Sequence, residues 1–591
     1  MNKFFGLVAI LAIFIAWQYP GNNDQWKNKI APSLLLKLEN GSAEEFIVVL
    51  TDQVNLNQSR LIHNKTQKGT YVYQKLRKHA EASQKGILNL LQERGSAYKS
   101  FFIVNAVYSK GDLELVRSLA LRSDVRAIED NPQVQIERTS TGGDSGNMRE
   151  GIEWGIEKIG ADQVWEMGYN GQGVIVAGAD TGVEWDHPAI MESYQGWDAD
   201  GVDHNYSWYD AVHEISPLHN DTIISPTNNP CGLSSTVPCD DHNHGTHTVG
   251  TMTGDDGMGN QIGVAPGAKW IACRNMERGW GSPATYIECF EWFLAPTDVN
   301  GENADTSKAP HVINNSWGCP PVEGCNPDNF SAMETTISNI KSAGVVVVVS
   351  AGNSGSSCGS ISNPAAIFEP SFTIGAFRSN DTIANFSSRG LVSVDESFRM
   401  KPNVAAPGVG VRSCVRGGGY STWNGTSMAG PHVAGMVALM ISANPALAGE
   451  VDIIEDIIEA TAIPMVAEQD CNDIAGDAVP NPVYGYGRID ALAAVEQALL
   501  YTTIEDPAAP NSLTVFPNPF SDQIELNMNN LTEKVVLSIF SADGKLMIIR
   551  SYEPQAFVND QIDTGSLPKG MYFYQLSGKN VLESGKLVRV D

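Results

Sequence analysis

Long apolar runs that end in small residues dominate the middle of the chain. Four of them read GVIVAGADTG, KWIACRNM, HVINNSWG and GVVVVVSAGN, between residues 173 and 353. Parallel strands that are buried on both faces have this near-continuous apolar character, and the stretches between them are typical of helical crossovers. The pattern predicts an α/β domain over residues 150–498, built on a doubly wound parallel sheet. Binding sites in such sheets lie at the carboxyl ends of the strands, where Asp180 and Asn353 fall.

The front of the chain shows a shorter alternation of strand-like and helix-like patterns. Strand, helix, strand, helix and strand follow one another at residues 44–50, 70–95, 101–109, 112–121 and 125–136. This order predicts a small α+β module over residues 44–137. A polar, glycine-rich stretch at residues 139–148 follows it and has the composition of a cleavable linker.

The end of the chain has a third pattern. A proline-containing linker at residues 502–511 is followed by six short runs in which apolar and polar residues alternate, separated by turn residues. Short alternating strands of this kind are typical of sandwiches. The pattern predicts a C-terminal all-β sandwich over residues 513–591. A different apolar stretch, at residues 431–443 after Ser427, predicts a central buried helix of the α/β domain.

The first residues combine one lysine with the apolar run FFGLVAILAIFIAW. This run is shorter than the roughly 20 apolar residues that span a bilayer as a helix. It fits the apolar part of a secretory signal peptide, which we place at residues 1–22. A short N-terminal anchor is the alternative.

The charge of the chain is uneven. The whole sequence carries −29, but residues 25–138 hold 17 Lys and Arg against 12 Asp and Glu, a balance of +5, so the remainder carries −34. An acidic body argues against a nucleic-acid partner, because such partners require basic patches that neutralise phosphates. The basic front segment is expected to be attracted to the acidic body, although unequal composition alone would give the same count.

All nine cysteines lie between Cys231 and Cys471. Together with an export signal, this clustering indicates disulfides formed in an oxidising compartment, and the odd number leaves at least one thiol free or paired outside the chain. Cys231 with Cys239, and Cys319 with Cys325, are close enough to close small loops. We expect the second of these pairs to be bonded. A zinc site is not indicated, since the chain has no CxxC pair and no HExxH.

Three short motifs carry candidate catalytic residues in one chain order. They are GADTG, HGTHTVG and NGTSMAGPH, which contain Asp180, His244 and Ser427. A serine hydroxyl is a weak nucleophile until a base lies within hydrogen-bond reach and a carboxylate orients that base. The order Asp, His, Ser is the order in subtilisin, and differs from that in chymotrypsin and the α/β-hydrolases. The chain resembles the subtilisin-like serine proteases, the subtilases.

This resemblance implies a secreted serine endopeptidase that acts on protein or peptide substrates through an acyl-enzyme and needs no cofactor for its chemistry. Ser427 is then the nucleophile, and its backbone N–H, at the start of the predicted helix, can donate to the oxyanion. His244 is the base among three neighbouring histidines, and Asp180 accepts its other ring N–H. The alternatives are a helix-capping Ser427, a structural His244 and an Asp180 that caps a turn.

Further site residues come from the same resemblance. Asn353, in SAGNSG, is the side-chain donor to the oxyanion, with a simple turn residue as the alternative. Two strand-end segments look like the edges of the first specificity pocket, where an extended substrate would pair, although ordinary buried strand ends are possible. These substrate-binding candidates are Ser316, Trp317, Gly318, Ser350, Ala351 and Gly352.

Two departures from the family pattern limit what the resemblance implies. Trp317 is bulkier than the aliphatic residue usual at its position, and Cys319 follows Gly318 directly, so the preferred substrate side chain is left open. Ala189, in DHPAI, stands where subtilisin has an aspartate that binds calcium. We expect that calcium site to be absent, and the sequence leaves open whether the protein binds structural calcium elsewhere.

The two flanking parts have resemblances of their own. The stretches FFIVNAVYS and VRAIEDN make the front module similar to the inhibitor-like propeptides of subtilases, so the protein's own propeptide is an expected inhibitor. FPNPF, DGK and LPKGMYFYQLS with SGKLVRV make the tail similar to sorting domains of the type IX secretion system of Bacteroidota. That resemblance implies export by outer-membrane secretion machinery to the medium or the cell surface.

Two rival functions use the same features differently. An inactive binding protein could keep the fold without catalysis, but the complete set of triad residues argues against it. A surface adhesin could use the β-rich tail as its working part, but the tail has no tandem copies and no aromatic binding platform.

Overall fold

The computed structural model describes most of the chain, in two compact units that divide at Tyr501 and Thr502. The described residues are 24–136, 139–141, 151–219, 224–225, 228–320, 323–501, 513–517, 519–531, 533–542, 544–578 and 582–590. The predicted signal peptide, the linker at 502–511 and most of the linker at 139–148 lie outside them.

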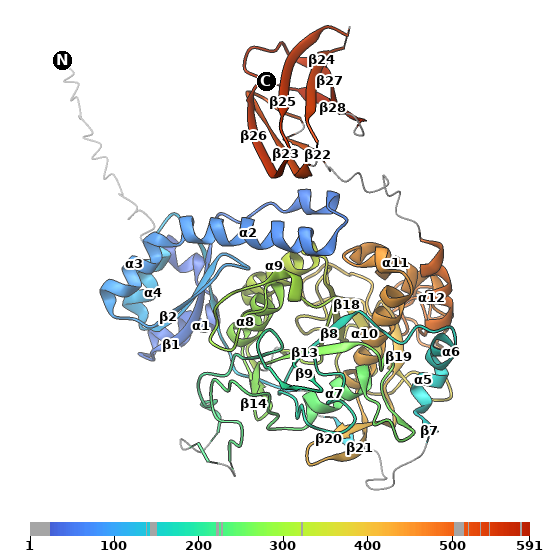
Figure 1. Ribbon diagram of the computed structural model, residues 1–591. Helices are drawn as coiled ribbons and strands as arrows, with labels where there is room; N and C mark the ends of the chain where they lie inside the picture. Colours follow the sequence, from blue (N-terminus) through green and yellow to red (C-terminus); the bar gives the residue numbers. More distant parts are fainter. Residues whose placement is uncertain are drawn as a thin grey trace, which may run out of the picture. The chain divides into compact units, whose positions relative to one another are not determined.

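A four-stranded antiparallel sheet forms the front of the first unit (Figure 1). Its order is β2-β3-β1-β4. One face packs against helices of the front part of the chain, as Phe46 and Val48 do, and the other face, with Ile47 and Val49, packs in a cluster shared with later residues. The strands are β1 (Glu44–Leu50), β2 (Tyr98–Phe101), β3 (Ala106–Gly111) and β4 (Val125–Asp130). The helices are α2 (Lys65–Ser83), α3 (Lys85–Arg94) and α4 (Leu113–Ala120), with the short 3-10 helix η2 (Asn57–Leu61).

The module starts earlier than its predicted boundary at residue 44. The 3-10 helix η1 (Gln25–Lys29) and helix α1 (Pro32–Glu39) precede β1. Trp26 and Leu34 lie in the same buried cluster as Phe46 of β1, so both helices belong to the module's core. We use the name front module for residues 24–136.

A seven-stranded parallel sheet forms the centre of residues 151–501, which we call the body. Four of its strands, β8, β13, β16 and β17, are the apolar runs singled out in the sequence. In spatial order the strands are β11 (Trp208–Asp210), β13 (Lys269–Arg274), β8 (Ile175–Asp180), β16 (Val312–Asn315), β17 (Val346–Ser350), β18 (Phe372–Phe377) and β19 (Val404–Pro407).

Helices cover both faces of this sheet, which confirms the doubly wound α/β fold (Figure 1). Successive residues of β8 point to opposite faces, so Val176 packs with α7 (His244–Thr253) and α10 (Thr426–Ala443), whereas Ala177 packs with α8 (Pro283–Leu294) and α9 (Ser331–Ser342). The remaining helices are α5 (Trp154–Lys158), α6 (Ala161–Glu166), α11 (Val451–Thr461), α12 (Ala491–Leu500), and the 3-10 helices η3 (Thr306–Lys308), η5 (Pro327–Asn329) and η6 (Pro445–Leu447).

Helix α10 is the predicted central helix. It is long and apolar enough to cross a membrane, but it is almost entirely buried inside the body. Its residues contact β16, β17, β18 and β19, so its apolar composition is that of a core helix.

Short strands at the rim of the body complete the first unit. Two three-stranded sheets, β14-β15-β5 and β20-β21-β6, each include a strand from the segment that joins the front module to the body. The strands are β5 (Val134–Gln135), β6 (Ser140–Thr141), β14 (Met276–Glu277), β15 (Trp280–Gly281), β20 (Val411–Val415) and β21 (Gly419–Asn424), with the pairs β7 (Gly151–Ile152) and β12 (Asn260–Gln261), and β9 (Trp197–Asp198) and β10 (Gly201–Val202).

Four disulfides lie in the body, and both short-range pairs suggested by the sequence are among them. Cys319 bonds Cys325, as expected, and Cys231 bonds Cys239, the other pair that is close enough to close a small loop. Cys414 is a free thiol, buried beneath α7. Two longer-range disulfides, which spacing did not indicate, are Cys273–Cys289 and Cys358–Cys471.

The tail domain, residues 513–590, is an all-β sandwich, as predicted. One sheet has the order β22-β23-β26, the other β25-β24-β27-β28, and residues of both form one apolar core. The strands are β22 (Leu513–Phe516), β23 (Gln523–Leu531), β24 (Val535–Ser541), β25 (Leu546–Tyr552), β26 (Gln555–Asp563), β27 (Gly570–Ser577) and β28 (Leu582–Arg589). β26 is the one strand that the six alternating runs did not include.

Candidate active site

Asp180 and His244 form a buried pair. Asp180 is the last residue of β8, and His244 is the first residue of α7. His244 Nδ1 lies 2.8 and 2.9 Å from the two carboxylate oxygens of Asp180. A carboxylate can only accept, so Nδ1 carries the proton, and Nε2 is the ring nitrogen left to act as a base. No hydrogen bond occupies His244 Nε2 among the described residues.

Close backbone contact between β8 and α7 brings this pair together. A Cβ on Gly245 would lie 2.0 Å from the carbonyl oxygen of Gly182, so only glycine fits directly after His244. The small residues of GADTG and HGTHTVG are therefore the cause of the short distance between Asp180 and His244.

Ser427 is the second residue of α10. Its backbone N–H is one of the first four in the helix, which have no partner within the helix and can donate to an anion. Its Oγ donates to the carbonyl oxygen of Ser316, 3.3 Å away, and is not bonded to His244. Catalytic hydrogen bonds are often long or misaligned before substrate binds, so this rotamer is compatible with attack after a rotation about χ1.

Asn353 lies beside the start of α10. It follows β17, and its Oδ1 accepts hydrogen bonds from the backbone N–H and the hydroxyl of Thr426, at 2.9 and 3.0 Å. Because both donors bind Oδ1, Nδ2 must be the other side of the amide. A Cβ on Gly425 would lie 3.6 Å from that Nδ2. The structure thus places an amide donor next to Ser427.

The first proposed edge of the specificity pocket follows β16. Ser316 is buried, and its backbone carbonyl accepts the hydrogen bond from Ser427 Oγ. The Trp317 indole stacks on Tyr286 of α8 at a centroid distance of 3.8 Å and packs edge-on against Phe290. Its bulk therefore fills core space next to α8, in the cluster that also holds Val134 of β5. The sequence did not indicate this orientation.

The second proposed edge follows β17. Ser350 and Ala351 are buried, and the N–H of Ala351 donates to the carbonyl of Ile374 in the neighbouring strand. Gly352 accepts from the N–H of Ser388 and donates to Thr426 Oγ1. The bond from Gly352 to Thr426 joins this segment to the start of α10.

Two further histidines near His244 have structural surroundings. His247 stacks on Trp423 at 4.5 Å with nearly parallel planes, and its Nε2 lies 3.2 Å from the carbonyl of Ser421. Burial lowers the pKa of His247 to about 3, so it stays neutral. Burial also lowers the pKa of His242. His247 thus faces away from Asp180, as its place in the helix predicts.

The position of the subtilisin calcium ligand is apolar here. Ala189 is buried, and its carbonyl accepts the N–H of Asp255. Within the described residues, no group of three or more His, Cys, Asp and Glu side chains could hold a metal ion. The absence of this calcium site stays a prediction.

The segment between the front module and the body crosses the site. β5 pairs antiparallel with β15, and the N–H of Ile136 donates to Gly279 at 2.7 Å. A few residues later, β6 pairs with β21, where Ser140 lies opposite Asn424. Asn424 precedes Ser427 by three residues, and a Cβ on Gly425 would lie 3.3 Å from Thr139 Cγ2, so this end of the segment reaches the start of α10. At the other end, a Cβ on Gly279, the partner of Ile136, would lie 3.2 Å from the ring of His242. The sequence indicated a linker here but not these two strands.

A doubly wound α/β body with a buried Asp–His pair at one strand end and a serine at a helix start defines a serine peptidase. A family model described as the subtilase family matches residues 171–487. The chain belongs to the subtilase family. It is 34% identical over 505 residues to Bacillopeptidase F of Bacillus subtilis and 28% identical over 386 residues to Subtilisin E of the same species.

These relatives overlap the chain to different extents. The match covers 79% of this chain but only 32% of Bacillopeptidase F, and 65% of this chain with 81% of Subtilisin E. M-protease of Shouchella clausii is 31% identical over 324 residues, covering 54% of this chain and 67% of that protein.

The tail domain has a separate match. A family model described as a secretion system C-terminal sorting domain matches residues 514–590. The tail is therefore a sorting domain, and it indicates a secreted or cell-surface protein.

Proposed function

We propose that this protein is a secreted serine endopeptidase, made as a precursor, that cuts peptide bonds through an acyl-enzyme on Ser427. Ser427 Oγ attacks the substrate carbonyl carbon while His244 Nε2 takes the hydroxyl proton. Asp180 holds the ring through Nδ1 and stabilises the imidazolium. His244 then gives the proton to the leaving amine, and a water molecule repeats the sequence to release the acyl group.

The oxyanion of the tetrahedral intermediate is stabilised by two donors, Asn353 Nδ2 and the N–H of Ser427. Such a donor acts without changing its own charge, and loss of one in a subtilisin lowers turnover about 100- to 1,000-fold. The same chemistry requires no cofactor.

The crossing segment is the observation that carries this proposal. The segment pairs with β15 through β5 and with β21, three residues before Ser427, through β6, and an extended substrate pairs with an enzyme by main-chain bonds of this kind. An inactive binding protein or an adhesin would have no reason to hold a peptide across an aligned Asp–His pair and an oxyanion donor.

A fluorophosphonate probe separates these functions. It reacts only with an activated serine, so the mature protein should be labelled once, and peptide mapping should place the label on Ser427. The labelled protein should lose all activity on casein. A mature, folded protein that binds casein but neither cuts it nor takes the label would be an inactive binding protein.

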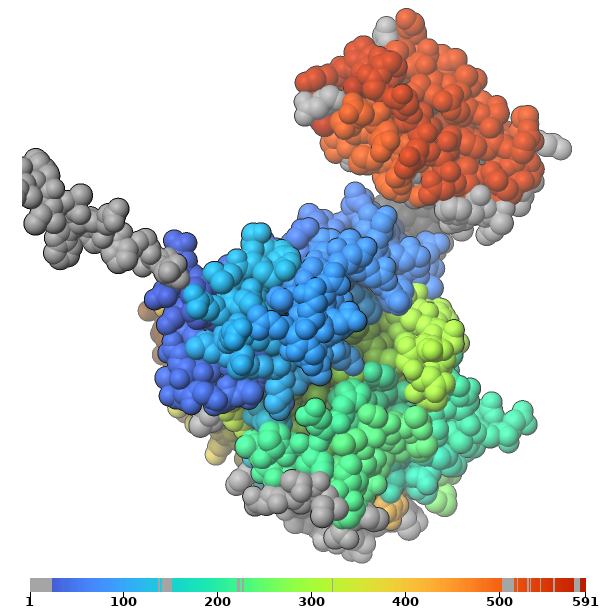
Figure 2. Space-filling view, turned by 90° about the vertical axis from the view of Figure 1, so that its left-hand side faces the viewer, coloured from blue at the N-terminus to red at the C-terminus, as the bar shows by residue number. Residues whose placement is uncertain are grey.

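We also propose that the front module is the inhibitory propeptide of this enzyme. Figure 2 shows the module lying directly against the body. The Glu291 carboxylate of α8 accepts the N–H groups of Phe102 and Ile103 at 2.6 and 2.9 Å, and the Asn339 amide of α9 donates to the carbonyl of Ile103. Burial raises the pKa of Glu291 to about 8, against the hydrogen bonds from Phe102 and Ile103, which lower it.

Basic side chains of the module reach acceptors on the body. Lys65 donates to the carbonyl of Ala309 at 2.7 Å, and Lys68 donates to that of Gly449 at 2.6 Å and lies near Glu450. These contacts give the opposite charges of the two parts a structural role.

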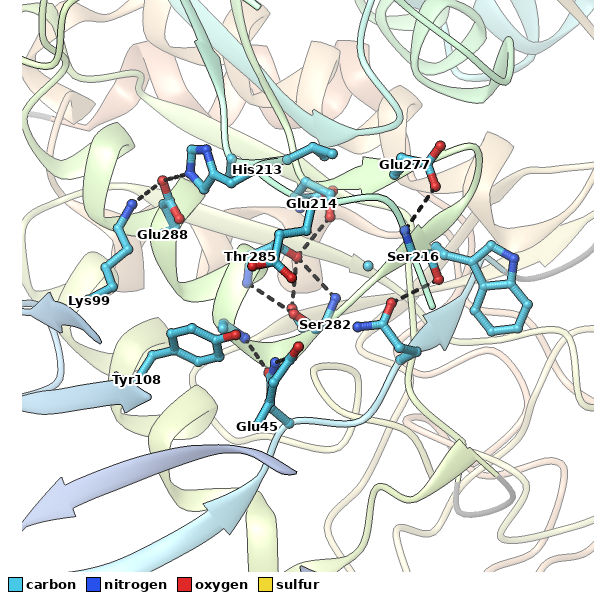
Figure 3. Close-up of a pocket in the computed structure, with 18 of the residues that line it drawn as sticks. Glu45, Lys99, Tyr108, His213, Glu214, Ser216, Glu277, Ser282, Thr285 and Glu288 are labelled. Atoms are coloured by element: carbon cyan, nitrogen blue, oxygen red, sulfur yellow. Dashed lines mark hydrogen bonds and ion pairs between the residues drawn. The ribbon is translucent and has the colours of Figure 1, made fainter. Parts of the chain in front are cut away.

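A cavity of about 210 Å³ at this interface is lined by both parts (Figure 3). Lys99 of the module forms an ion pair with Glu288 of the body, which His213 also contacts at 2.8 Å. These pairs are largely buried, but the module and the body also attract each other at long range through their opposite net charges, and salt screens that attraction.

The isolated front module, residues 24–136, should inhibit the mature enzyme. We expect inhibition to weaken at least severalfold between 50 mM and 500 mM salt, because salt screens the long-range attraction between the positive front segment (+5) and the negative remainder of the chain (−34). The inhibition constant, measured with a peptide substrate over this salt range, tests both statements. A module that ends at residue 130 is the matched control: it keeps the antiparallel sheet but lacks β5, and it should inhibit more weakly at every salt concentration.

The maturation cut should fall between Ile136 and Ser140. Ile136 is bonded to Gly279, and Ser140 pairs with Asn424, three residues before Ser427, so we expect the bond presented to the nucleophile to lie between them. Amino-terminal sequencing of the mature enzyme should therefore start at residue 137, 138, 139 or 140. If the first detectable product instead begins well beyond residue 141, the crossing segment is not the substrate of self-cleavage.

A further inference from the structure

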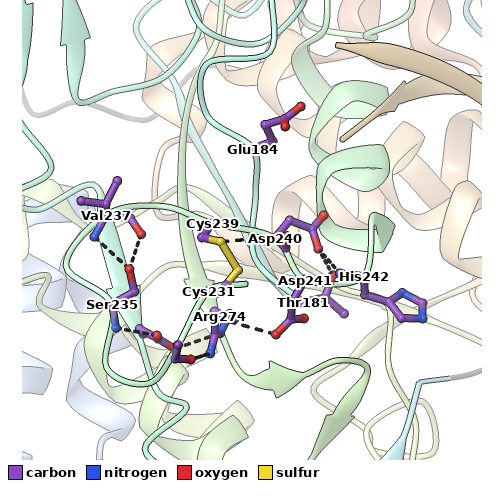
Figure 4. Close-up of a disulfide and its surroundings, with 12 residues drawn as sticks. Thr181, Glu184, Cys231, Ser235, Val237, Cys239, Asp240, Asp241, His242 and Arg274 are labelled. Carbon is purple, nitrogen blue, oxygen red and sulfur yellow. Dashed lines mark hydrogen bonds and ion pairs between the residues drawn. A yellow bond between two sulfur atoms is a disulfide. The ribbon is translucent and has the colours of Figure 1, made fainter. Parts of the chain in front are cut away.

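Asp240 lies outside the triad but is bonded to the segments that carry two of its members, Asp180 and His244. It is 2% exposed and precedes His244 by four residues (Figure 4). Its two carboxylate oxygens accept five hydrogen bonds among the described residues. Oδ1 accepts from the Thr181 hydroxyl at 2.9 Å and from the N–H groups of His242 and Asn243 at 2.8 and 2.9 Å. Oδ2 accepts from the N–H and the hydroxyl of Thr246, at 3.1 and 2.6 Å.

These bonds replace the ordinary N-terminal cap of α7. The residue at the cap position, Asn243, has a left-handed backbone with φ of 87° and makes no side-chain cap bond. Asp240 instead accepts the N–H of Thr246, and Thr181 Oγ1 accepts the N–H of Gly245 at 3.0 Å. Two unpaired N–H groups at the start of the helix are therefore satisfied by side chains from outside it.

Thr181 extends the connection to the other member of the pair. It is the residue after Asp180, and its hydroxyl donates to Asp240 while accepting from Gly245, the residue after His244. Its own N–H donates to Asp180 Oδ1 at 2.8 Å. The group formed by Asp240 and Thr181 thus bonds to the backbone next to Asp180 and next to His244 at once.

We infer that Asp240, acting through Thr181, is a positioning residue that sets the distance and orientation between Asp180 and His244. The inference rests on the proposed catalytic role of these two residues. The disulfide Cys231–Cys239 ends one residue before Asp240 and, with a Cα–Cα distance of 5.6 Å, closes a short loop that limits the movement of this carboxylate.

Two substitutions test the role. Asp240→Asn removes a charge, whereas Thr181→Val changes no charged group. In Asp240→Asn one carboxylate oxygen becomes a donor, so it can no longer accept the bonds that reach that atom. In Thr181→Val the hydroxyl link is lost with little change in shape. We expect kcat on a peptide substrate to fall at least tenfold in the first and at least threefold in the second, with KM within twofold. Because both substitutions break the same hydrogen bond between Thr181 and Asp240, kcat of the double variant should be little lower than kcat of Asp240→Asn alone.

Asp210→Asn is the matched control. Asp210 is also buried, pairs with Arg274 and accepts the backbone N–H groups of Val212 and Ser235, but it has no bond to Thr181 or α7. It should lower the melting temperature while leaving kcat per active site within twofold, with active sites counted by fluorophosphonate labelling.

Three results would overturn the inference. One is an unchanged kcat in Asp240→Asn, and another is an equal fall of kcat in Asp210→Asn, which would indicate a general loss of structure. If Asp240→Asn does not fold, an unchanged kcat in Thr181→Val overturns it. Failure of the wild-type enzyme to take the fluorophosphonate label would instead contradict the proposed function itself.

Discussion

Ser427→Ala should abolish peptidase activity and leave the precursor uncut. Alanine removes the only atom that attacks the substrate and keeps the backbone N–H, so binding and folding should persist without turnover. Loss of the serine from a subtilisin triad lowers kcat about 10⁶-fold, or about 8 kcal/mol of transition-state stabilisation. The measurements are kcat on a peptide substrate and the length of the purified protein on a denaturing gel.

The uncut precursor is the more informative half of this result. The crossing segment is held against β15 and β21 by main-chain bonds that Ser427→Ala does not touch. The variant should therefore keep its front module attached, and it should not react with added fluorophosphonate. Asp210→Asn serves as the processed control, since it alters a buried residue away from the nucleophile. Normal maturation of pure Ser427→Ala would show that another protease cuts this chain.

The chemistry of the site could be predicted from the sequence because it lies in short contiguous motifs. GADTG and SAGNSG each follow an apolar run, and parallel strands place such ends at one edge of the sheet. The structure brings Asp180 to His244 at 2.8 Å and Asn353 to the start of α10, as those motifs suggest. Their catalytic roles stay predictions until the variants are measured.

Contacts between distant segments could not be predicted in the same way. The bond from Thr181 to Asp240 joins two loops, and neither residue type is unusual for a turn. Trp317 could be recognised as bulky, but not that it would stack on Tyr286. The pairing of Cys358 with Cys471 spans 113 residues and depends on the completed fold.

Local pattern also gave a wrong boundary in the front module. The apolar run at residues 101–109 predicts one strand, but the structure ends β2 at Phe101 and starts β3 at Ala106. The turn between them has Asn105 at a φ of 43°, with its side-chain Oδ1 accepting from Ser83 and Gln84. Phe102 and Ile103 also lie in this turn, and their N–H groups donate hydrogen bonds to the Glu291 carboxylate of the body. The interruption therefore belongs to the interface with the body, which hydrophobic periodicity does not describe.

Removal of residues 513–591 should leave the enzyme active and stop its export. The tail domain is a compact unit with its own apolar core, and all the proposed catalytic residues lie in the other unit. A domain that buries its own strands contributes little to the folding of its neighbour, so the truncated enzyme should mature and cut peptides at the wild-type rate. Its family match identifies it as a sorting domain, which is read by a secretion system.

The measurement is activity in the medium, the cell envelope and the periplasm of a host that has type IX secretion. Truncated enzyme should be active and confined to the periplasm, whereas full-length protein should reach the medium or the cell surface. A fusion of residues 502–591 to the end of an unrelated periplasmic protein is the matched control, and it should be exported. Truncated enzyme that folds but is inactive would assign the tail to the catalytic machinery, and normal release of truncated enzyme would contradict the sorting role in this protein.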